Sequence, residues 1–250
     1  MDAQDRPSSS HDDTAHNPQP VPNEPRSEGE RGVSMAIWET TSFQQWYAAQ
    51  AGAGNQLVAA RPEWTLRIGN GLVFFWALRV SIWIADEQRI KDNEVVIGRP
   101  DIATVLMYRR GRTLDDSLVV LVREFRSPAR TTDGYIRELP GGSSLKPTQD
   151  PETLAVGEVS EETGLAIESA RLRDHGARQV AGTTTSHAAA LFSVELTEDE
   201  VAWLRAQHRT AHGVIEDTER TYVEVTTLGA IRSAPVTDWG MLGMILQVLA

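Results

Sequence analysis

Three glutamates in one short segment have the residue type and the spacing of a cation-binding site. Glu158, Glu161 and Glu162 lie at positions i, i+3 and i+4 of a predicted helix, and this spacing places side chains on one helical face. Like charges this close repel one another, so the cluster indicates either a solvated acidic surface or a bound cation. Hard divalent ions such as Mg²⁺ take oxygen ligands and keep waters and substrate phosphates in their remaining positions.

The signals that bound this helix are strong. Asp150 is a good N-cap and Pro151 suits the first helical position. Gly164 is a natural C-terminal stop, so we expect a helix that ends near Thr163. A buried strand is predicted at Leu118–Val122, and a Gly-Gly loop follows it before the helix begins. The predicted order is therefore strand, glycine loop, acidic helix and glycine stop.

This order and the segment from Glu158 to Leu165 resemble the signature of the Nudix hydrolases. The second half of that signature is REUxEExGU, where U is aliphatic, and Glu158–Leu165 matches it at every specified position after the arginine. The first half departs from the pattern. Gly157 stands at the arginine position, Gln149 stands at the upstream glutamate position, and the place of Gly142 implies an inserted loop residue.

Two further segments are similar to the ADP-ribose pyrophosphatase and nucleoside-diphosphate-sugar hydrolase branch. That branch has an aliphatic strand, a Q-aromatic-R tripeptide and an ExPAG loop. Val120–Arg126 and Glu138–Gly142 follow this pattern, with Glu124 in place of the Gln and Gly141 in place of the Ala. The resemblance implies an α/β (α+β) fold, a Nudix-type α/β/α sandwich with a mixed sheet. It also implies extra N-terminal strands, which in this branch often help to build a homodimer.

The resemblance implies roles for individual residues. The predicted metal ligands for Mg²⁺ or Mn²⁺ are the three helix glutamates and one carbonyl: Gly141, Glu158, Glu161 and Glu162. The predicted catalytic acids are Glu161, Glu162 and Glu219, and the predicted substrate-binding residues are Arg126 and Glu138. Hydrolysis of a diphosphate needs charge neutralisation and an activated water, and the guanidinium of Arg126 suits phosphate oxygens.

Some of these residues also have plainer interpretations. Arg126 could be a solvated cation, Glu138 could brace the glycine loop, and Arg137 is expected to lie on the sheet surface. His187 could face the site or be an ordinary loop residue. The further acid that the branch places before the last strand could be any of three: Glu216, Asp217 or Glu219, with Glu219 favoured because it lies nearest Tyr222.

Composition excludes several classes of function. A formal charge of −11 argues against binding to a nucleic-acid backbone. The chain has no cysteine, so it has neither a disulfide framework nor a thiol nucleophile. Its first residues lack a secretory pattern. Its most apolar run, Leu72–Ala85, contains Arg79 and is too short to span a bilayer. A cytoplasmic protein with no membrane partner is expected.

The chain divides into a tail and one domain in this interpretation. Residues 1–34 are polar and are predicted to be a disordered tail, and residues 35–250 are the predicted Nudix domain. Within that domain, residues 35–100 form an N-terminal extension with helical structure between Ile37 and Ala60, ended by glycines, and extended structure from Trp64 to Ile84. Later strands and helices are predicted at 102–108, 117–122, 135–139, 177–181, 188–196, 198–207, 222–226 and 239–249.

The expected function is metal-dependent hydrolysis of a nucleoside diphosphate derivative such as ADP-ribose or an NDP-sugar. The products would be a nucleoside monophosphate and a phosphorylated remainder. Gly157 and Gln149 leave open a non-catalytic Nudix domain that binds a nucleotide. The altered loop that begins at Gly141 leaves open a specialised biosynthetic enzyme that acts on an unusual nucleotide.

Overall fold

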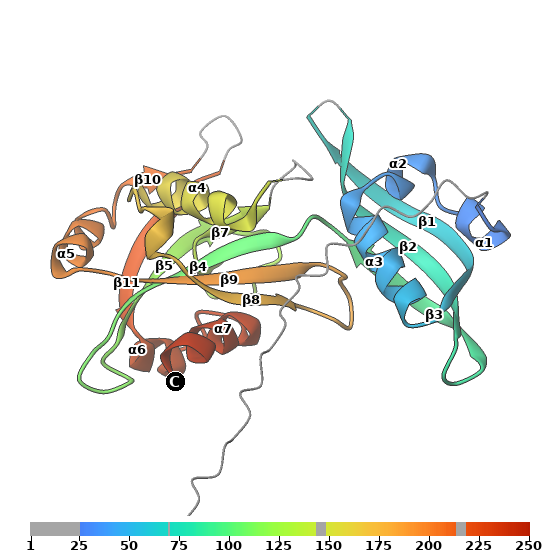
Figure 1. The fold of residues 1–250 in the computed structure, drawn as a ribbon. Coiled ribbons are helices and arrows are strands. Elements are labelled where there is room, and N and C mark those ends of the chain that lie inside the picture. Colours follow the sequence, from blue (N-terminus) through green and yellow to red (C-terminus); the bar gives the residue numbers. More distant parts are fainter. Residues whose placement is uncertain (1–25, 70, 144–148, 214–218) are drawn as a thin grey trace, which may run out of the picture.

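A computed structural model describes residues 26–69, 71–143, 149–213 and 219–250. It shows a mixed α and β protein with two separate sheets (Figure 1). The first sheet has three strands and the second has eight. The predicted class, with a mixed sheet and additional N-terminal strands, is confirmed.

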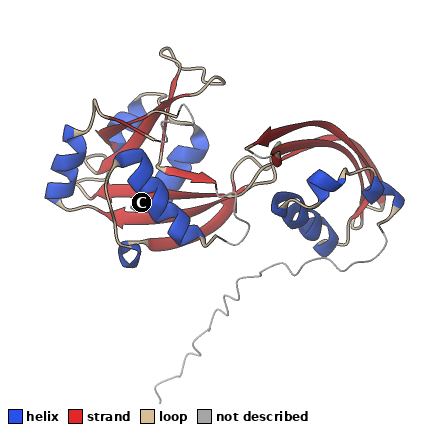
Figure 2. Cartoon of the chain, turned by 90° about the horizontal axis from the view of Figure 1, so that it is seen from above, coloured by secondary structure: helices blue, strands red, loops and turns tan. Residues whose placement is uncertain are grey.

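The N-terminal sheet is an antiparallel meander covered by helices on one face (Figure 2). Its elements are α1 (Glu28–Arg31), α2 (Met35–Trp38), α3 (Thr41–Gly52), β1 (Gln56–Ile68), β2 (Leu72–Ile84) and β3 (Arg89–Gly98). Alternate residues of β2 point to the same face, and Trp76, Leu78 and Val80 are buried together with Phe43. The indole N–H of Trp76 donates to the hydroxyl of Ser42 at 2.9 Å. This lobe therefore has a hydrophobic core of its own.

The predicted boundary of the tail at residue 34 is wrong. Ser27 and Glu30 form a capping box that begins α1, and Val33 is only 1% exposed. A Cβ on Gly29 would lie 2.1 Å from the carbonyl oxygen of Leu57, so this helix packs directly on β1. One valine and one glycine are enough to anchor a segment whose average composition is polar. Residues 1–25, the remainder of the predicted tail, lie outside the described residues.

Two details of the N-terminal lobe differ from the sequence prediction. The helical segment ends at Gly52, one of the glycines expected to end it, but β1 already begins at Gln56, before Ala60 and well before Trp64. The strand β3 was not predicted, because its first half is polar and charged. Its pairing with β2 runs from Ile84↔Arg89 to Trp76↔Gly98, so the hairpin partner determines its conformation.

The second sheet has the order β10-β11-β5-β4-β9-β8, with β6 paired to β5 and β7 paired to β4. Its strands are β4 (Ile102–Arg109), β5 (Leu118–Phe125), β6 (Tyr135–Glu138), β7 (Gly141–Ser143), β8 (Arg173–Gln179), β9 (Ala188–Glu195), β10 (Ala211–His212) and β11 (Thr221–Thr227). The pair β4–β9 is parallel, and the other pairs among these described strands are antiparallel. The sheet is therefore mixed.

Helices cover both faces of this second sheet. They are α4 (Pro151–Thr163), α5 (Glu198–Ala206), α6 (Leu228–Ser233) and α7 (Trp239–Leu249), with a short 3-10 helix at Ser169–Arg171. On β4, Val105 and Met107 face the core shared with α4 and α5, whereas Leu106 faces the core shared with α6 and α7. The central strands are buried on both faces, which explains their nearly continuous apolar sequence. The result is a helix–sheet–helix layering (Figure 1).

Backbone hydrogen bonds join the two sheets where β3 ends. The amide of Ile97 donates to the carbonyl of Thr184 at 3.2 Å, and the amide of Ser186 donates to the carbonyl of Ile97 at 2.9 Å. The loop between β8 and β9 thus pairs with the last strand of the N-terminal lobe. Among the described helices, none combines the length and the apolar character needed to cross a membrane.

Candidate active site

The helix α4 carries the acidic residues and has the predicted ends. The carboxylate of Asp150 accepts a hydrogen bond from the amide of Thr153 at 2.9 Å, and Pro151 follows at the first position. Gly164 ends the helix in a left-handed conformation with φ 74°, which favours glycine. Glu158 and Glu162 are one turn apart on this helix and point towards the same region.

Glu162 is the most deeply buried carboxylate of the cluster. Its side chain accepts a hydrogen bond from the amide of Gly141 at 2.8 Å, and the residue is 4% exposed. Burial raises the pKa of Glu162 well above its usual range, the Gly141 amide lowers it, and the nearby Glu158 raises it further. The carbonyl of Glu162 accepts from the hydroxyl of Thr221 at 3.0 Å, which ties α4 to β11.

Glu158 lies directly against the glycines of β7. A Cβ placed on Gly142 would be 2.4 Å from the Oε1 atom of Glu158, so only glycine leaves room for this carboxylate. Burial raises the pKa of Glu158 to about 7, and the charges of Glu161 and Glu219 contribute to the shift. The predicted glycine loop is thus a short strand, in which Gly142 leaves room for Glu158 and the backbone amide of Gly141 binds Glu162.

An arginine and two glutamates flank these carboxylates. The Nη2 atom of Arg126 lies 2.7 Å from Glu124 and 3.0 Å from Glu138. Only the contact with Glu138 has hydrogen-bond geometry, so the buried Oε2 atom of Glu124 has an ion-pair neighbour but no hydrogen-bond partner among the described residues. Burial raises the pKa of Glu124 to about 7, Arg126 lowers it, and Glu219 and Glu138 raise it.

Sequence reasoning did not include Glu124 in the site. Its signal was present, because it is the residue that replaces Gln in the tripeptide ending at Arg126. Glu124 is a carboxylate at the end of a buried strand, two residues before a candidate phosphate-binding arginine. A carboxylate in such a place is expected to pair with a cation. The structure brings Arg126, Glu124 and Glu138 together, as neighbouring positions of the paired strands β5 and β6 permit.

The other predicted acids differ in their placement. Glu161 is exposed, and its backbone carbonyl accepts a hydrogen bond from the amide of Gly213 at 2.9 Å. Glu219 precedes β11, and its charge contributes to raising the pKa of both Glu158 and Glu162. Its carboxylate therefore lies within electrostatic reach of the α4 cluster. The alternatives Glu216 and Asp217 lie outside the described residues.

Arg137 and His187 are also placed by the structure. Arg137 binds Asp133 at 2.8 Å and Glu224 at 3.4 Å, so its charge is already paired on the sheet surface. His187 is half-buried, and its Nδ1 atom is buried without a hydrogen-bond partner among the described residues. Burial lowers the pKa of His187, and the charge of Arg99 adds to that effect. His187 therefore lies near Arg99, where the β8–β9 loop meets the end of β3.

The donor set suits a hard divalent cation. Within the described ranges, no three His, Asp or Glu side chains converge closely enough to enclose a metal ion. However, Mg²⁺ usually takes only one or two protein carboxylates and completes its shell with waters and substrate phosphates. Glu158 and Glu162 are two such carboxylates, and burial raises the pKa of both. The roles of Glu161 and of the Gly141 carbonyl as ligands stay predictions.

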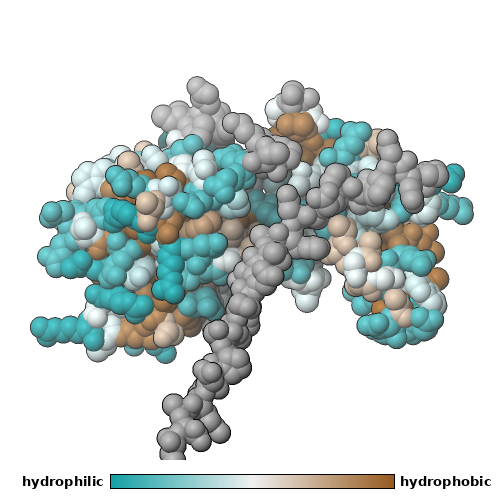
Figure 3. All heavy atoms as spheres, viewed as in Figure 1, coloured by the Kyte–Doolittle hydropathy of each residue, from teal (hydrophilic) through white to brown (hydrophobic). Residues whose placement is uncertain are grey.

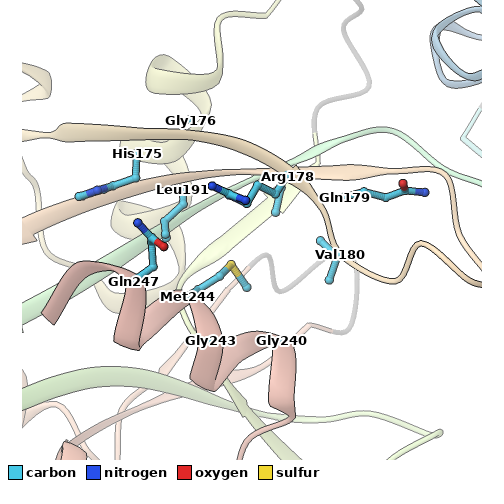
Figure 4. A pocket seen from close by; sticks show the side chains of 11 residues that line it. His175, Gly176, Arg178, Gln179, Val180, Leu191, Gly240, Gly243, Met244 and Gln247 are labelled. Atoms are coloured by element: carbon cyan, nitrogen blue, oxygen red, sulfur yellow. The ribbon is translucent and has the colours of Figure 1, made fainter. Parts of the chain in front are cut away.

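A cavity elsewhere in the fold does not coincide with these residues. It has a volume of about 240 Å³ and lies between β8, β9 and α7, on the face of the sheet opposite to α4. Figure 4 shows Met244 and Gln247 of α7 pointing towards the strands from one side of it. None of the predicted site residues lines this cavity. The acidic site is instead built against the strand β7.

Comparisons with known proteins identify no family for this chain. Protein-family models do not match it, and a search of curated proteins finds no match. The likeness to the Nudix signature therefore depends on the residues of α4 and of the preceding strands.

Proposed function

We propose that this chain is a Nudix-type hydrolase that uses Mg²⁺ or Mn²⁺ to cleave the diphosphate of a nucleoside diphosphate derivative. The observation that carries the proposal is the burial of Glu158 and Glu162 against the glycines of β7, with Arg126 on the flank. Buried like charges are costly unless a cation compensates them. The negatively charged diphosphate of the substrate would bind both this cation and the guanidinium of Arg126.

In this proposal, some residues bind the cation and others contact the phosphates of the substrate. Glu158, Glu162 and Glu161 would hold the cation, together with the carbonyl of Gly141. When bound, the cation would neutralise phosphate charge and lower the pKa of an attacking water. Arg126 would contact phosphate oxygens through its planar guanidinium, while Glu138 keeps that group oriented by accepting its hydrogen bond at 3.0 Å.

A base is also needed to take the proton of the attacking water. Glu219 fits this role because it comes from the segment that precedes β11, and its charge acts on both Glu158 and Glu162. Glu161 is the alternative within α4. The proposed substrates are ADP-ribose and NDP-sugars, and the proposed products are a nucleoside monophosphate and a phosphorylated remainder.

A hydrolysis screen tests this function. The protein would be incubated with ADP-ribose, NDP-sugars, dinucleoside polyphosphates, NADH and coenzyme A, with and without Mg²⁺, and the products resolved by chromatography. We expect Mg²⁺-dependent release of a nucleoside monophosphate from at least one of them. Turnover that is confined to an unusual nucleotide outside this set would favour the specialised biosynthetic enzyme. No turnover with any diphosphate would contradict the hydrolase.

A second candidate is a nucleotide-binding domain without catalysis. Two observations favour it: the sequence departs from the signature at Gly157 and Gln149, and among the described residues no three His, Asp or Glu side chains lie close enough together to hold a metal ion. Calorimetric titration with ADP-ribose separates the two candidates. Binding at micromolar concentration without hydrolysis would support the binding domain.

We also propose a homodimer formed through the open face of the N-terminal sheet. Trp64 and Leu66 are each 48% exposed and lie opposite Ala77 and Phe75 of β2, on the face away from the helices. A hydrophobic patch is visible at the tip of the β1–β2 hairpin in Figure 3, where Leu72 is 51% exposed. Light scattering coupled to gel filtration tests this, with Leu66→Glu expected to shift a dimer to a monomer.

A further inference from the structure

The cavity between β8, β9 and α7 is a concave site of its own, on the face of the sheet opposite to the acidic residues. Its volume is about 240 Å³. Ala189 and Leu191 of β9 form its buried floor, and Val180 adds an apolar wall. The residues of α7 that line it are Gly240, Gly243, Met244 and Gln247. Ligand sites commonly have this form, an apolar hollow with a few polar groups.

A glycine in the middle of α7 keeps this space open. The four lining positions of the helix are spaced i, i+3, i+4 and i+7, which places them on one helical face, the face that meets the strands. A Cβ on Gly243 would have no neighbouring atom within 4 Å. Glycine inside a helix is less favourable than alanine, so at Gly243 the helix is less stable than it could be and leaves room beside the sheet.

Arg178 is the one charged side chain among the described residues that line the cavity. It pairs with Ala189 across the antiparallel strands β8 and β9, and residues opposed in this way project to the same face of a sheet. In Figure 4 its guanidinium extends along the strands towards Leu191. Among the described residues it has neither a hydrogen-bond partner nor an ion-pair partner. Because β8 is the edge strand, this free cation lies on the open side of the cavity.

The other polar side chains of the cavity leave the charge of Arg178 uncompensated. The Nε2 atom of His175 is 2.8 Å from the hydroxyl of Ser193. Burial lowers the pKa of His175, and the charge of Arg173 lowers it further, so the ring is neutral at pH 7. The amide of Gln247 has no hydrogen-bond partner among the described residues. The cavity thus offers one cation and one free amide, which together suit an acceptor with a single negative charge.

The volume sets the size of the ligand. An apolar cavity of about 150 Å³ holds one benzene molecule. By proportion, the present cavity holds roughly ten non-hydrogen atoms. A nucleotide is too large for it, whereas a short aliphatic or aromatic acid fits. The planar fork of a guanidinium matches the two oxygens of a carboxylate.

We propose that this cavity binds a small monocarboxylate with an apolar body. The carboxylate would pair with Arg178 at the open side and accept a hydrogen bond from Gln247. The apolar body would lie on Leu191 and against Met244, in the space beside Gly243. The site is separate from the proposed hydrolase site, and its occupation requires no diphosphate and no metal.

Nuclear magnetic resonance of isotope-labelled methionine methyl groups tests this in the full-length protein. Met244 lines the cavity, whereas Met107 lies in the core on the other face of the sheet and is the internal reference. The probes are octanoate, octanamide, which has the same chain without the charge, and acetate, which has the charge without the chain. We expect octanoate to shift the Met244 signal with a Kd of about 1 mM or tighter, as a ligand of this size allows. Octanamide should bind about tenfold more weakly, since a charge-assisted contact is lost, and acetate should cause no shift.

Three variants locate the ligand. Arg178→Met removes the charge and keeps a long side chain, so it should weaken octanoate to the level of octanamide and leave octanamide unchanged. Arg173→Met is the matched control, because Arg173 is an exposed arginine of the same strand that does not line the cavity; it should bind octanoate like the unchanged protein. Gly243→Leu fills the space without displacing a neighbouring atom at its Cβ, so it should abolish binding of both probes while the melting temperature stays the same or rises.

Several results would overturn the proposal. Equal affinity for octanoate and octanamide would show that Arg178 does not select an anion. Unchanged binding in Gly243→Leu would place the ligand outside the cavity, as would a shift of Met107 as large as that of Met244. An unmoved Met244 signal at about 20 mM octanoate, well above the expected Kd, would show that the cavity does not take this class of ligand. None of these measurements depends on hydrolysis, so they decide the cavity separately from the proposed function.

Discussion

The carboxylate of Glu162 has two requirements, of which the strand β7 meets the first. It needs a hydrogen-bond donor, which the amide of Gly141 supplies at 2.8 Å, and it needs a way to compensate its charge. Without a cation, burial is the largest influence on its pKa. A glutamine at this position would keep the hydrogen bond and remove the charge. One substitution can therefore separate the effect of the charge from the effect of the side-chain shape.

Glu162→Gln is therefore expected to lower turnover by about a hundredfold or more, because it removes a charged oxygen ligand. The amide oxygen can still accept from Gly141, so the melting temperature without metal should be unchanged or higher. Assays at saturating Mg²⁺ and thermal unfolding without metal measure the two effects. Glu152→Gln, in the first turn of the same helix, is the control. Unchanged turnover in Glu162→Gln would remove this residue from the site.

Glu124 gives the protein a dependence on pH that can be measured. Its pKa is about 7 in the folded protein against a usual 4.5, so the folded state holds the proton more strongly than the unfolded chain. The stability that this group contributes is fully present below about pH 4.5 and is lost as pH rises through about 7. Glu158 and Glu162, with raised pKa values, act in the same direction.

We expect the metal-free protein to melt at a lower temperature at about pH 8 than at about pH 5, and Glu124→Gln to reduce that difference. Thermal unfolding across this range in low salt, with Glu152→Gln as the control, measures it. A melting temperature that rises over the same interval in both proteins would show that Glu124 does not titrate as its burial implies.

At the level of elements, the decisive contact is between α4 and β7. Glycine at position 142 makes room for Glu158, because a Cβ would approach its Oε1 atom to 2.4 Å. The obstructing atom is the end of a flexible side chain, so a larger residue would displace the carboxylate rather than unfold the strand. This contact can therefore be perturbed without losing the fold.

Gly142→Ala is expected to lower Mg²⁺-dependent turnover at least tenfold by moving a ligand, with little change in melting temperature. The control is Gly157→Ala on the same helix, where a Cβ meets nothing within 4 Å. That change should stabilise the protein by about 1 kcal/mol, as expected for removal of a mid-helix glycine. Equal activity of the two variants would show that the close approach of Gly142 has no role in the site.

The elements that sequence predicted well are those whose signals are local. The ends of α4 at Asp150 and Gly164 depend on neighbouring residues only, and they are confirmed. Strand β3 and the helix α6 were missed, since pairing with β2 and packing on the core determine them. The pairing of Arg126 with Glu124 and Glu138 depends on the register of β5 and β6, which local pattern does not encode.

At the level of the whole molecule, α1 helps to close the N-terminal lobe. Val33 is 1% exposed, and Tyr47 of α3 donates a hydrogen bond to the carboxylate of Glu30. We expect a chain that begins at residue 35 to be less stable than one that begins at residue 26, by roughly 2 kcal/mol from the burial of one valine and nearby contacts. Urea unfolding followed by tryptophan fluorescence measures the difference.

The turnover of the two truncated chains is the control for this comparison of stability. The contacts of α1 are with β1 and α3, remote from α4, so the two chains should have similar kcat at a temperature where both are folded. Identical free energies of unfolding would show that α1 packs on the lobe without stabilising it.

The single parallel pair of the described second sheet has a consequence for the order of folding. Ile102 of β4 pairs with Ala189 of β9, so the centre of this sheet closes only after a long stretch of intervening chain has been ordered. The N-terminal meander consists of adjacent hairpins, and such local contacts form much faster. During synthesis it would be complete before β9 leaves the ribosome. Five of the seven tryptophans lie in the N-terminal lobe, in the meander and the helices that cover it, so stopped-flow refolding should show fluorescence recovering ahead of the circular dichroism of the second sheet.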